Sequence, residues 1–149
     1  MAFFIDANIH VIYSMTEVVI GKWTPSNGEG IYGTRPWKIY GEGPTTAKKQ
    51  AKGRFGGLND VCPYEAADIR FTTKGETLYA FCMSAPTGNV RITSLGKTSK
   101  LNDKKIASVK MLGSKQKLVW KQEADALVIT KPSKLPEWQV VTFKFEFKK

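Results

Sequence analysis

The sequence has 149 residues, of which 42% are hydrophobic and 24% are charged. This length and apolar content are typical of one folded domain and exclude intrinsic disorder. The formal net charge of +10 suits an anionic partner, but the lysines of the second half occur singly or in pairs. We interpret them as the solvated side of strands, and we expect no nucleic-acid partner.

The first 24 residues are apolar and rich in β-branched side chains, without a clean helical or strand period. The chain has no apolar run of about 18 or more residues, so we predict no membrane span. The start lacks the positively charged region of a signal peptide, and Asp6 interrupts its apolar stretch. We therefore expect the chain as it stands to be soluble. Either it is cytoplasmic, or its export signal was lost with a missing N-terminal part.

Residues 25–67 are rich in turn signals, namely PSNGEG, GTRP, GEGPTT and KGRFGGLND, and we predict mainly loop there. Helix signals are weak throughout, and the best candidate is the polar stretch TTAKKQAKG. The two cysteines, Cys62 and Cys82, lack the spacing of a metal site. Cys82 lies in an apolar run, which predicts a buried thiol, and a disulfide between the two stays an open alternative.

The remainder, from residue 68 onward, is a succession of short strand-like runs. DIRFT and TLYAFCM, joined by the turn KGE, predict a hairpin. The runs VRITSL, IASVKML, KLVWKQ and ALVIT follow, and the last run alternates with Val141, Phe143, Phe145 and Phe147 on one face. We therefore predict an all-β fold, a two-layer antiparallel β-sandwich of seven to eight strands with a loop-rich N-terminal third.

The run IGKWTPSNGEGIYGTRPWKIYGEGPT, residues 20–45, resembles a motif of the alpha-L-fucosidases, glycoside hydrolase family 29. In that family the motif closes the catalytic barrel and leads into a C-terminal sandwich. The resemblance departs from the family at Gly30, where Ala is usual. It implies that residues 1–24 are a remnant or cover of the barrel junction, and that residues 25–149 are the sandwich domain. Members of the family are often exported or lysosomal.

The resemblance also implies which residues form the junction between barrel and sandwich. They are Asn27, Glu29, Tyr32, Arg35, Trp37 and Glu42. Because Pro36 restricts the backbone, Arg35 and Trp37 are held in defined directions. The carboxylates of Glu29 and Glu42 are predicted to accept hydrogen bonds from backbone N–H groups or to pair with Arg35.

The same segment supplies candidate contact surfaces. Trp37 and Trp23 are candidates for stacking on a sugar. We expect an apolar surface around Ile20, Trp23, Ile31 and Tyr32 that binds the fucosidase barrel, drives self-association, or is covered by residues 1–19.

We expect no catalytic residue, no metal site and no cofactor. A retaining glycosidase needs two carboxyl groups about 5 Å apart, and nothing in the sequence places together any two of Glu29, Glu42, Asp60, Glu65 and Asp68. His10 is the only histidine, which disfavours a catalytic triad or a zinc site. The leading hypothesis is a non-catalytic accessory domain of an alpha-L-fucosidase, and the alternative is a stand-alone carbohydrate-binding module with a glycan ligand.

Overall fold

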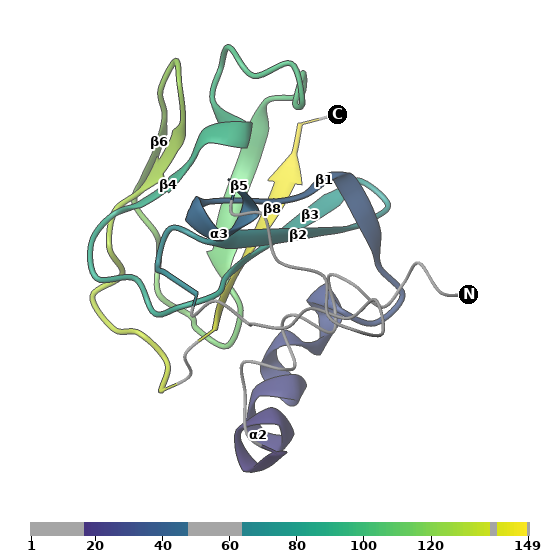
Figure 1. Cartoon of the computed structure of the whole chain (residues 1–149), viewed down its shortest axis with the longest axis vertical. Helices are drawn as coiled ribbons and strands as arrows, with labels where there is room; N and C mark the ends of the chain where they lie inside the picture. The colour runs from purple at the N-terminus through teal and green to yellow at the C-terminus, as the bar shows by residue number, and fades with distance from the viewer. Residues whose placement is uncertain (1–16, 48–63, 138–139, 149) are drawn as a thin grey trace.

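The computed structural model describes residues 17–47, 64–137 and 140–148. In these ranges the regular secondary structure is mainly β-strand (Figure 1). The elements are α2 (Glu17–Asn27), η2 (Gly28–Gly30), β1 (Arg35–Glu42), α3 (Pro44–Ala47), β2 (Ile69–Lys74), β3 (Thr77–Cys82), β4 (Val90–Ile92), η3 (Thr93–Leu95), β5 (Ile106–Met111), β6 (Trp120–Gln122), β7 (Leu127–Ile129) and β8 (Val141–Phe147). Among these helices none is long and apolar enough to cross a membrane.

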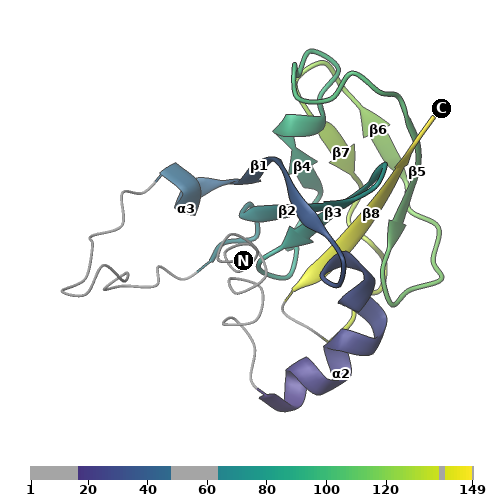
Figure 2. The same cartoon turned by 90° about the vertical axis from the view of Figure 1, so that its right-hand side faces the viewer.

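The strands form two antiparallel sheets, as the sequence predicts. One sheet has the order β1-β2-β3-β8-β5 and the other the order β4-β7-β6. Figure 2 shows the smaller sheet facing the larger one. The predicted hairpin is β2–β3, and its turn places Gly75 at a φ of 58°, where a residue without Cβ is favoured. All seven predicted strand-like runs after residue 67 contain a strand.

The main core lies between the two sheets and is organised by β8, which pairs with both β3 and β5. Val141, Phe143 and Phe145 are buried in this core, and Phe147 packs against it. The alternation predicted for the last run is therefore confirmed. We call the side of the large sheet that faces this core the inner face.

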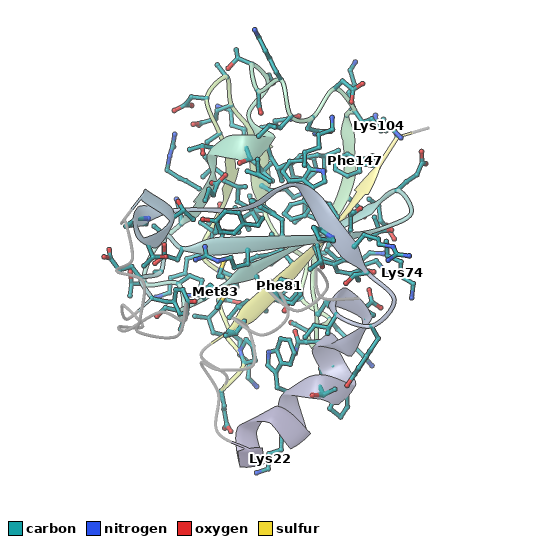
Figure 3. The ribbon with its side chains drawn as sticks, turned by 45° about the vertical axis from the view of Figure 1, so that its right-hand side comes forward. Lys22, Lys74, Phe81, Met83, Lys104 and Phe147 are labelled. Carbon is teal, nitrogen blue, oxygen red and sulfur yellow. The ribbon has the colours of Figure 1, made fainter. Side chains whose placement is uncertain are left out.

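The opposite side of the large sheet, the outer face, is also buried. Along β3 and the residue that follows it, Tyr79, Phe81 and Met83 belong to a second apolar cluster with Val140 and with Trp23 of α2. Figure 3 shows Phe81 on the side of the sheet where α2 lies, away from Phe147. The large sheet is thus covered by the small sheet on one side and by α2 on the other.

Two elements were not predicted from the sequence. Helix α2 carries Pro25 near its end and has no apolar stripe at helical spacing, so the periodicity gave no signal for it. Strand β1 lies in the segment predicted as loop, at the edge of the large sheet, where Pro36 removes no hydrogen bond that the sheet interior needs. The prediction of loop was wrong at β1. Both elements escaped the sequence analysis because β1 pairs with β2 and α2 packs against β3.

Three further predictions concern the helix candidate, the division of the chain and the two cysteines. Of the helix candidate TTAKKQAKG, α3 includes only the first three residues, and residues 48–53 lie outside the described part. The division of the chain after residue 24 falls inside α2 and stays a prediction. Cys82 is a free buried thiol, as predicted, whereas Cys62 lies outside the described residues.

Candidate functional site

Trp23 seals the outer face of the large sheet. Its side chain is 2% exposed, its indole Nε1 donates a 3.0 Å hydrogen bond to the carbonyl oxygen of Val140, and its ring lies 6.2 Å from that of Phe81. A buried indole offers no face to a sugar, so the prediction of sugar stacking by Trp23 is wrong. For the same reason, Trp23 contributes nothing to an exposed apolar surface.

The chain leaves α2 through a close contact with the sheet. Asn27 is buried, and its Nδ2 donates a 3.0 Å hydrogen bond to the carbonyl oxygen of Trp23, one helical turn earlier. Thr72 on β2 donates its hydroxyl to the carbonyl oxygen of Gly30 at 2.5 Å. A Cβ atom at Gly30 would lie 2.9 Å from Cζ of Phe81. The glycine at this departure from the family motif therefore permits the approach of η2 to the sheet.

Glu29 connects η2 with the centre of the large sheet. Its Oε1 lies 2.8 Å from Nζ of Lys144 on β8. The hydrogen bond to Glu29 raises the pKa of Lys144, and burial together with the same carboxylate raises the pKa of Tyr79. Glu29 thus pairs with a lysine rather than with Arg35 or a backbone N–H group, and this predicted pairing was wrong.

Glu42 at the end of β1 holds the two layers together. Its carboxylate accepts hydrogen bonds from the backbone N–H of Thr93 at 2.7 Å, from that of Ser94 at 2.9 Å, and from the Ser94 hydroxyl. These donors open η3, the short helix that follows β4 of the small sheet. An anionic acceptor at a helix N-terminus satisfies otherwise unpaired N–H groups. The predicted bonding of Glu42 to backbone N–H groups is confirmed.

The remaining junction residues lie apart from these. Arg35 begins β1 and is exposed, and Tyr32 is 65% exposed. Trp37 is half-buried on the inner face, with its ring 5.1 Å from that of Phe71 in an edge-on contact. The structure therefore does not gather the six predicted junction residues into one site. The side chain of Ile20 lies outside the described part of the chain.

A buried polar cluster was missed by the sequence analysis. Arg70 is 4% exposed, and its guanidinium lies 5.5 Å from the ring centroid of Tyr40 and 5.3 Å from that of Tyr64. Asp68 accepts hydrogen bonds from the backbone N–H and hydroxyl of Thr45 and from the N–H of Glu65. Charge on the polar side of DIRFT was visible in the sequence, but its burial depends on Tyr40 and Tyr64 from segments with no strand pattern.

Three of the five candidate catalytic carboxylates are therefore engaged in structural contacts. Glu29 pairs with Lys144, Glu42 binds the start of η3, and Asp68 binds α3 and the turn before β2. Asp60 and the sole histidine, His10, lie outside the described residues. Within the described ranges, no three side chains of His, Cys, Asp or Glu gather in a way that suits a metal ion.

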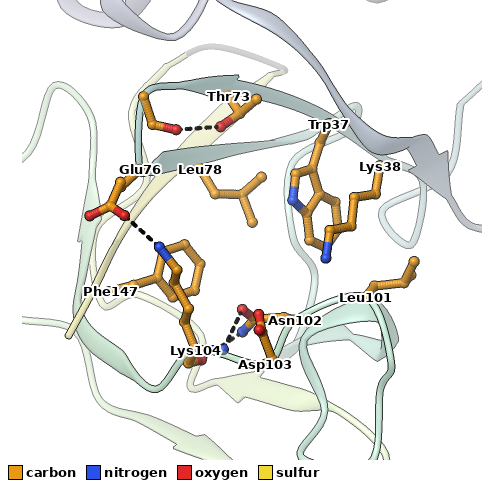
Figure 4. A pocket seen from close by; sticks show the side chains of 11 residues that line it. Trp37, Lys38, Thr73, Glu76, Leu78, Leu101, Asn102, Asp103, Lys104 and Phe147 are labelled. Atoms are coloured by element: carbon orange, nitrogen blue, oxygen red, sulfur yellow. Dashed lines mark hydrogen bonds and ion pairs between the residues drawn. The ribbon is translucent and has the colours of Figure 1, made fainter. Parts of the chain in front are cut away.

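A pocket of about 150 Å³ opens on the inner face beside Trp37 (Figure 4). It is lined by parts of β1, the β2–β3 turn, the loop before β5 and the end of β8. The residues are Trp37, Lys38, Thr73, Gly75, Glu76, Leu78, Leu101, Asn102, Asp103, Lys104 and Phe147. Among these only Trp37 was a predicted site residue, because the other segments are brought together by the tertiary fold alone.

Comparison with known sequences identifies the sandwich. A family model described as the alpha-L-fucosidase C-terminal domain matches residues 63–146. The tissue alpha-L-fucosidase of Mus musculus is 27% identical over 145 residues, which are 96% of this chain and 26% of the relative. That of Homo sapiens is 26% identical over 145 residues, 96% of this chain and 25% of the relative. The chain thus spans about a quarter of the length of these relatives.

Solved structures agree on the fold. The Thermotoga maritima alpha-fucosidase superimposes with a TM-score of 0.55 at 24% identity, over 85% of this chain and 24% of that one. An alpha-L-fucosidase isoenzyme 1 from Paenibacillus thiaminolyticus gives a TM-score of 0.53 at 18% identity, over 88% and 25% of the two chains. In both, the matched part is again about a quarter of the longer chain.

Proposed function

This chain belongs to the alpha-L-fucosidase C-terminal domain family, and we propose that it acts as the non-catalytic accessory sandwich of an alpha-L-fucosidase. In this role it packs against the catalytic domain and stabilises it. One observation carries the proposal, namely that the described motif carboxylates serve the sandwich itself. Glu29 pairs with Lys144 and Glu42 binds the start of η3. Both carboxylates are thus used in contacts within the sandwich, which supports a structural role for them.

The solvent side of α2 is the face that we assign to the catalytic domain. The sheet side of this helix is sealed by Trp23, whereas Gly21, Lys22 and Pro25 point to solvent. Figure 3 shows the side chain of Lys22, in the middle of α2, pointing away from the sandwich. Tyr32, which follows η2, is 65% exposed. An exposed tyrosine beside a helix that rests on the sheet is a suitable aromatic anchor for a domain contact.

The absence of catalysis is tested with an aryl alpha-L-fucoside. We expect the purified chain to release no aryl alcohol above the rate in buffer. The Glu29→Gln, Glu42→Gln and Asp68→Asn variants would then behave like the unmodified chain. Turnover by the chain that one of these single substitutions abolishes would refute the proposal.

The stabilising role is tested with an alpha-L-fucosidase catalytic domain expressed without its own C-terminal quarter. We expect added chain to bind this domain and to raise its Tm, because a ligand that binds only the folded state stabilises it. Tyr32→Arg should weaken binding by about tenfold or more. Val119→Arg is the matched control, because Val119 is 70% exposed and precedes β6 in the other sheet.

Three results would count against this role. They are an unchanged Tm of the catalytic domain, equal weakening by the two arginine variants, and self-association of the chain through Tyr32 that excludes the catalytic domain. The last is recognised by sedimentation, because Tyr32→Arg would then convert a dimer to a monomer.

A further inference from the structure

The Trp37 pocket has a rigid aromatic wall. Trp37 follows Pro36, whose ring restricts the backbone, and its indole is held edge-on against Phe71 at 5.1 Å and 61°. Phe71 itself is completely buried. The part of the indole that does not pack on the core lines the pocket, where Figure 4 shows it beside Lys38. A fixed, half-buried indole presents apolar surface without a large loss of side-chain entropy on binding.

Polar groups surround this wall on the other sides. Lys38 lies on the same strand as Trp37, and the opposite rim carries Lys104 with Glu76, whose carboxylate it contacts at 2.5 Å. Asn102 binds the backbone N–H and carbonyl of Lys104 through its side-chain amide, which fixes the loop before β5. An aromatic wall with a few convergent polar groups is the usual composition of a small-ligand site.

The charge of the pocket favours an anion. A wider depression of about 630 Å³ adjoins it and is lined by Glu76, Asp103, Lys104, Lys105 and Lys148, of which the first three also line the pocket. Together the two hollows carry four lysines, counting Lys38, and two carboxylates. The excess of positive charge attracts a negatively charged ligand group, and the whole chain, at +10, strengthens this preference.

We propose that this pocket binds a sugar unit that carries a carboxylate or sulfate group. The ring packs on the indole of Trp37, and the anionic group faces Lys38 and the lysines of the adjoining depression. The pocket opens on the inner face of the large sheet, whereas α2 covers the outer face. A catalytic domain on α2 therefore leaves it open, and this site is independent of the accessory role.

The test is an NMR titration of the purified chain with three matched probes. They are methyl galactoside, methyl galacturonoside and methyl galactoside 6-sulfate, which differ only in a neutral, carboxylated or sulfated sixth carbon. We expect the indole N–H signal of Trp37 to move with the acidic probes and their affinity to exceed that of the neutral probe by about tenfold or more. The two acidic probes separate a carboxylate site from a sulfate site.

Paired variants test the position of the site. Trp37→Leu should weaken binding of the preferred acidic probe by about tenfold or more, whereas Trp120→Leu, at a half-buried tryptophan of β6, should leave it unchanged. Lys38→Gln should weaken it, and Lys121→Gln, at an exposed lysine elsewhere, should not. If Trp37→Leu prevents folding, the exposed Lys38→Gln still decides, since its removal disturbs no core contact.

Several outcomes would overturn the proposal. One is the absence of binding to both acidic probes, and another is equal binding of the neutral probe. Equal losses of affinity for the acidic probe in Lys38→Gln and Lys121→Gln would indicate only a general attraction of a basic chain for anions. Binding that survives Trp37→Leu in a folded variant would place the ligand elsewhere.

Discussion

The indole Nε1 of Trp23 donates a 3.0 Å hydrogen bond to the carbonyl oxygen of Val140, a residue 117 positions further along the chain. The bond joins helix α2 to the residue just before β8, the strand that organises the main core. Both partners are almost completely buried. The helix that precedes the sandwich in sequence is therefore an integral part of it.

Removing this side chain should destabilise the whole domain. We expect Trp23→Ala to lower the free energy of unfolding by about 3–5 kcal/mol, because it opens a cavity at the outer face. Trp23→Phe should lower it by about 1–3 kcal/mol, because the buried carbonyl of Val140 loses its donor. Urea unfolding followed by circular dichroism measures both. Tyr32→Ala is the control and should change stability by less than about 0.5 kcal/mol.

Substitution by alanine should have opposite effects on stability at Gly30 and at Gly21. Gly30→Ala places a Cβ atom 2.9 Å from Cζ of Phe81, which should lower stability by about 1–3 kcal/mol. Gly21 lies inside α2 with no heavy atom within 4 Å of its virtual Cβ. Gly21→Ala should therefore raise stability by about 0.5–1 kcal/mol. Thermal melts of the two variants would contradict this account if both Tm values moved in the same direction.

Glu42 should be essential to the contact between the two sheets. We expect Glu42→Ala to lower the free energy of unfolding by about 1–3 kcal/mol, because the part-buried N–H and the hydroxyl of Ser94 and the exposed N–H of Thr93 lose their acceptor. Amide hydrogen exchange should accelerate at Thr93 and Ser94 in this variant. Glu123→Ala, which removes an exposed partner of Arg91, should cost less than about 1 kcal/mol. Equal costs of the two substitutions would show that Glu42 has no special role.

The stability of the domain at alkaline pH should depend on the ionisation of the Cys82 thiol. Burial raises the pKa of this thiol from 9.0 to about 12, so the unfolded chain loses the proton at a lower pH than the folded chain. The thiol's contribution to stability is therefore complete below pH 9.0 and is lost as the pH rises toward 12. The expected slope from this one group is about −1.4 kcal/mol per pH unit within that window.

The control for this slope is Cys82→Ala. It should lower stability at neutral pH, because a buried side chain is truncated, and should show a shallower decline of stability above pH 9.0. A decline of unchanged steepness in Cys82→Ala would assign the alkaline transition to other groups, among them Tyr79 and Lys144, whose pKa values are also raised.

The sandwich was predictable because its apolar runs are short and separated by turn signals, and because the last of them alternates in sequence. In the last run the phenylalanines occupy every second position, and the structure buries that side between the sheets. The hairpin around Gly75 was equally clear, since a glycine turn separates two apolar runs. Local periodicity thus reflects a burial pattern that any two-layer sheet would impose on these residues.

Local sequence patterns did not predict helix α2 or strand β1. The apolar residues of α2 follow no helical stripe, and β1 is an edge strand with alternate residues only partly buried. Their conformations are decided by contacts with residues far away in the chain, such as Trp23 with Val140 and Trp37 with Phe71. Propensity and period are weak guides for segments stabilised in this way.

The candidate sites, too, were predictable from the sequence only in part. By itself the sequence determined the two-layer β fold, the likeness of residues 20–45 to a fucosidase junction, and the acceptor role of Glu42 toward backbone N–H groups. Only the tertiary structure decided that Trp23 is sealed inside while Trp37 lines a pocket with Lys104. Both are tryptophans of one motif, and their difference arises because α2 covers one face of the large sheet while β1 extends along its edge. Whether a side chain is exposed depends on how the layers pack, so residues close together in the sequence can differ in exposure.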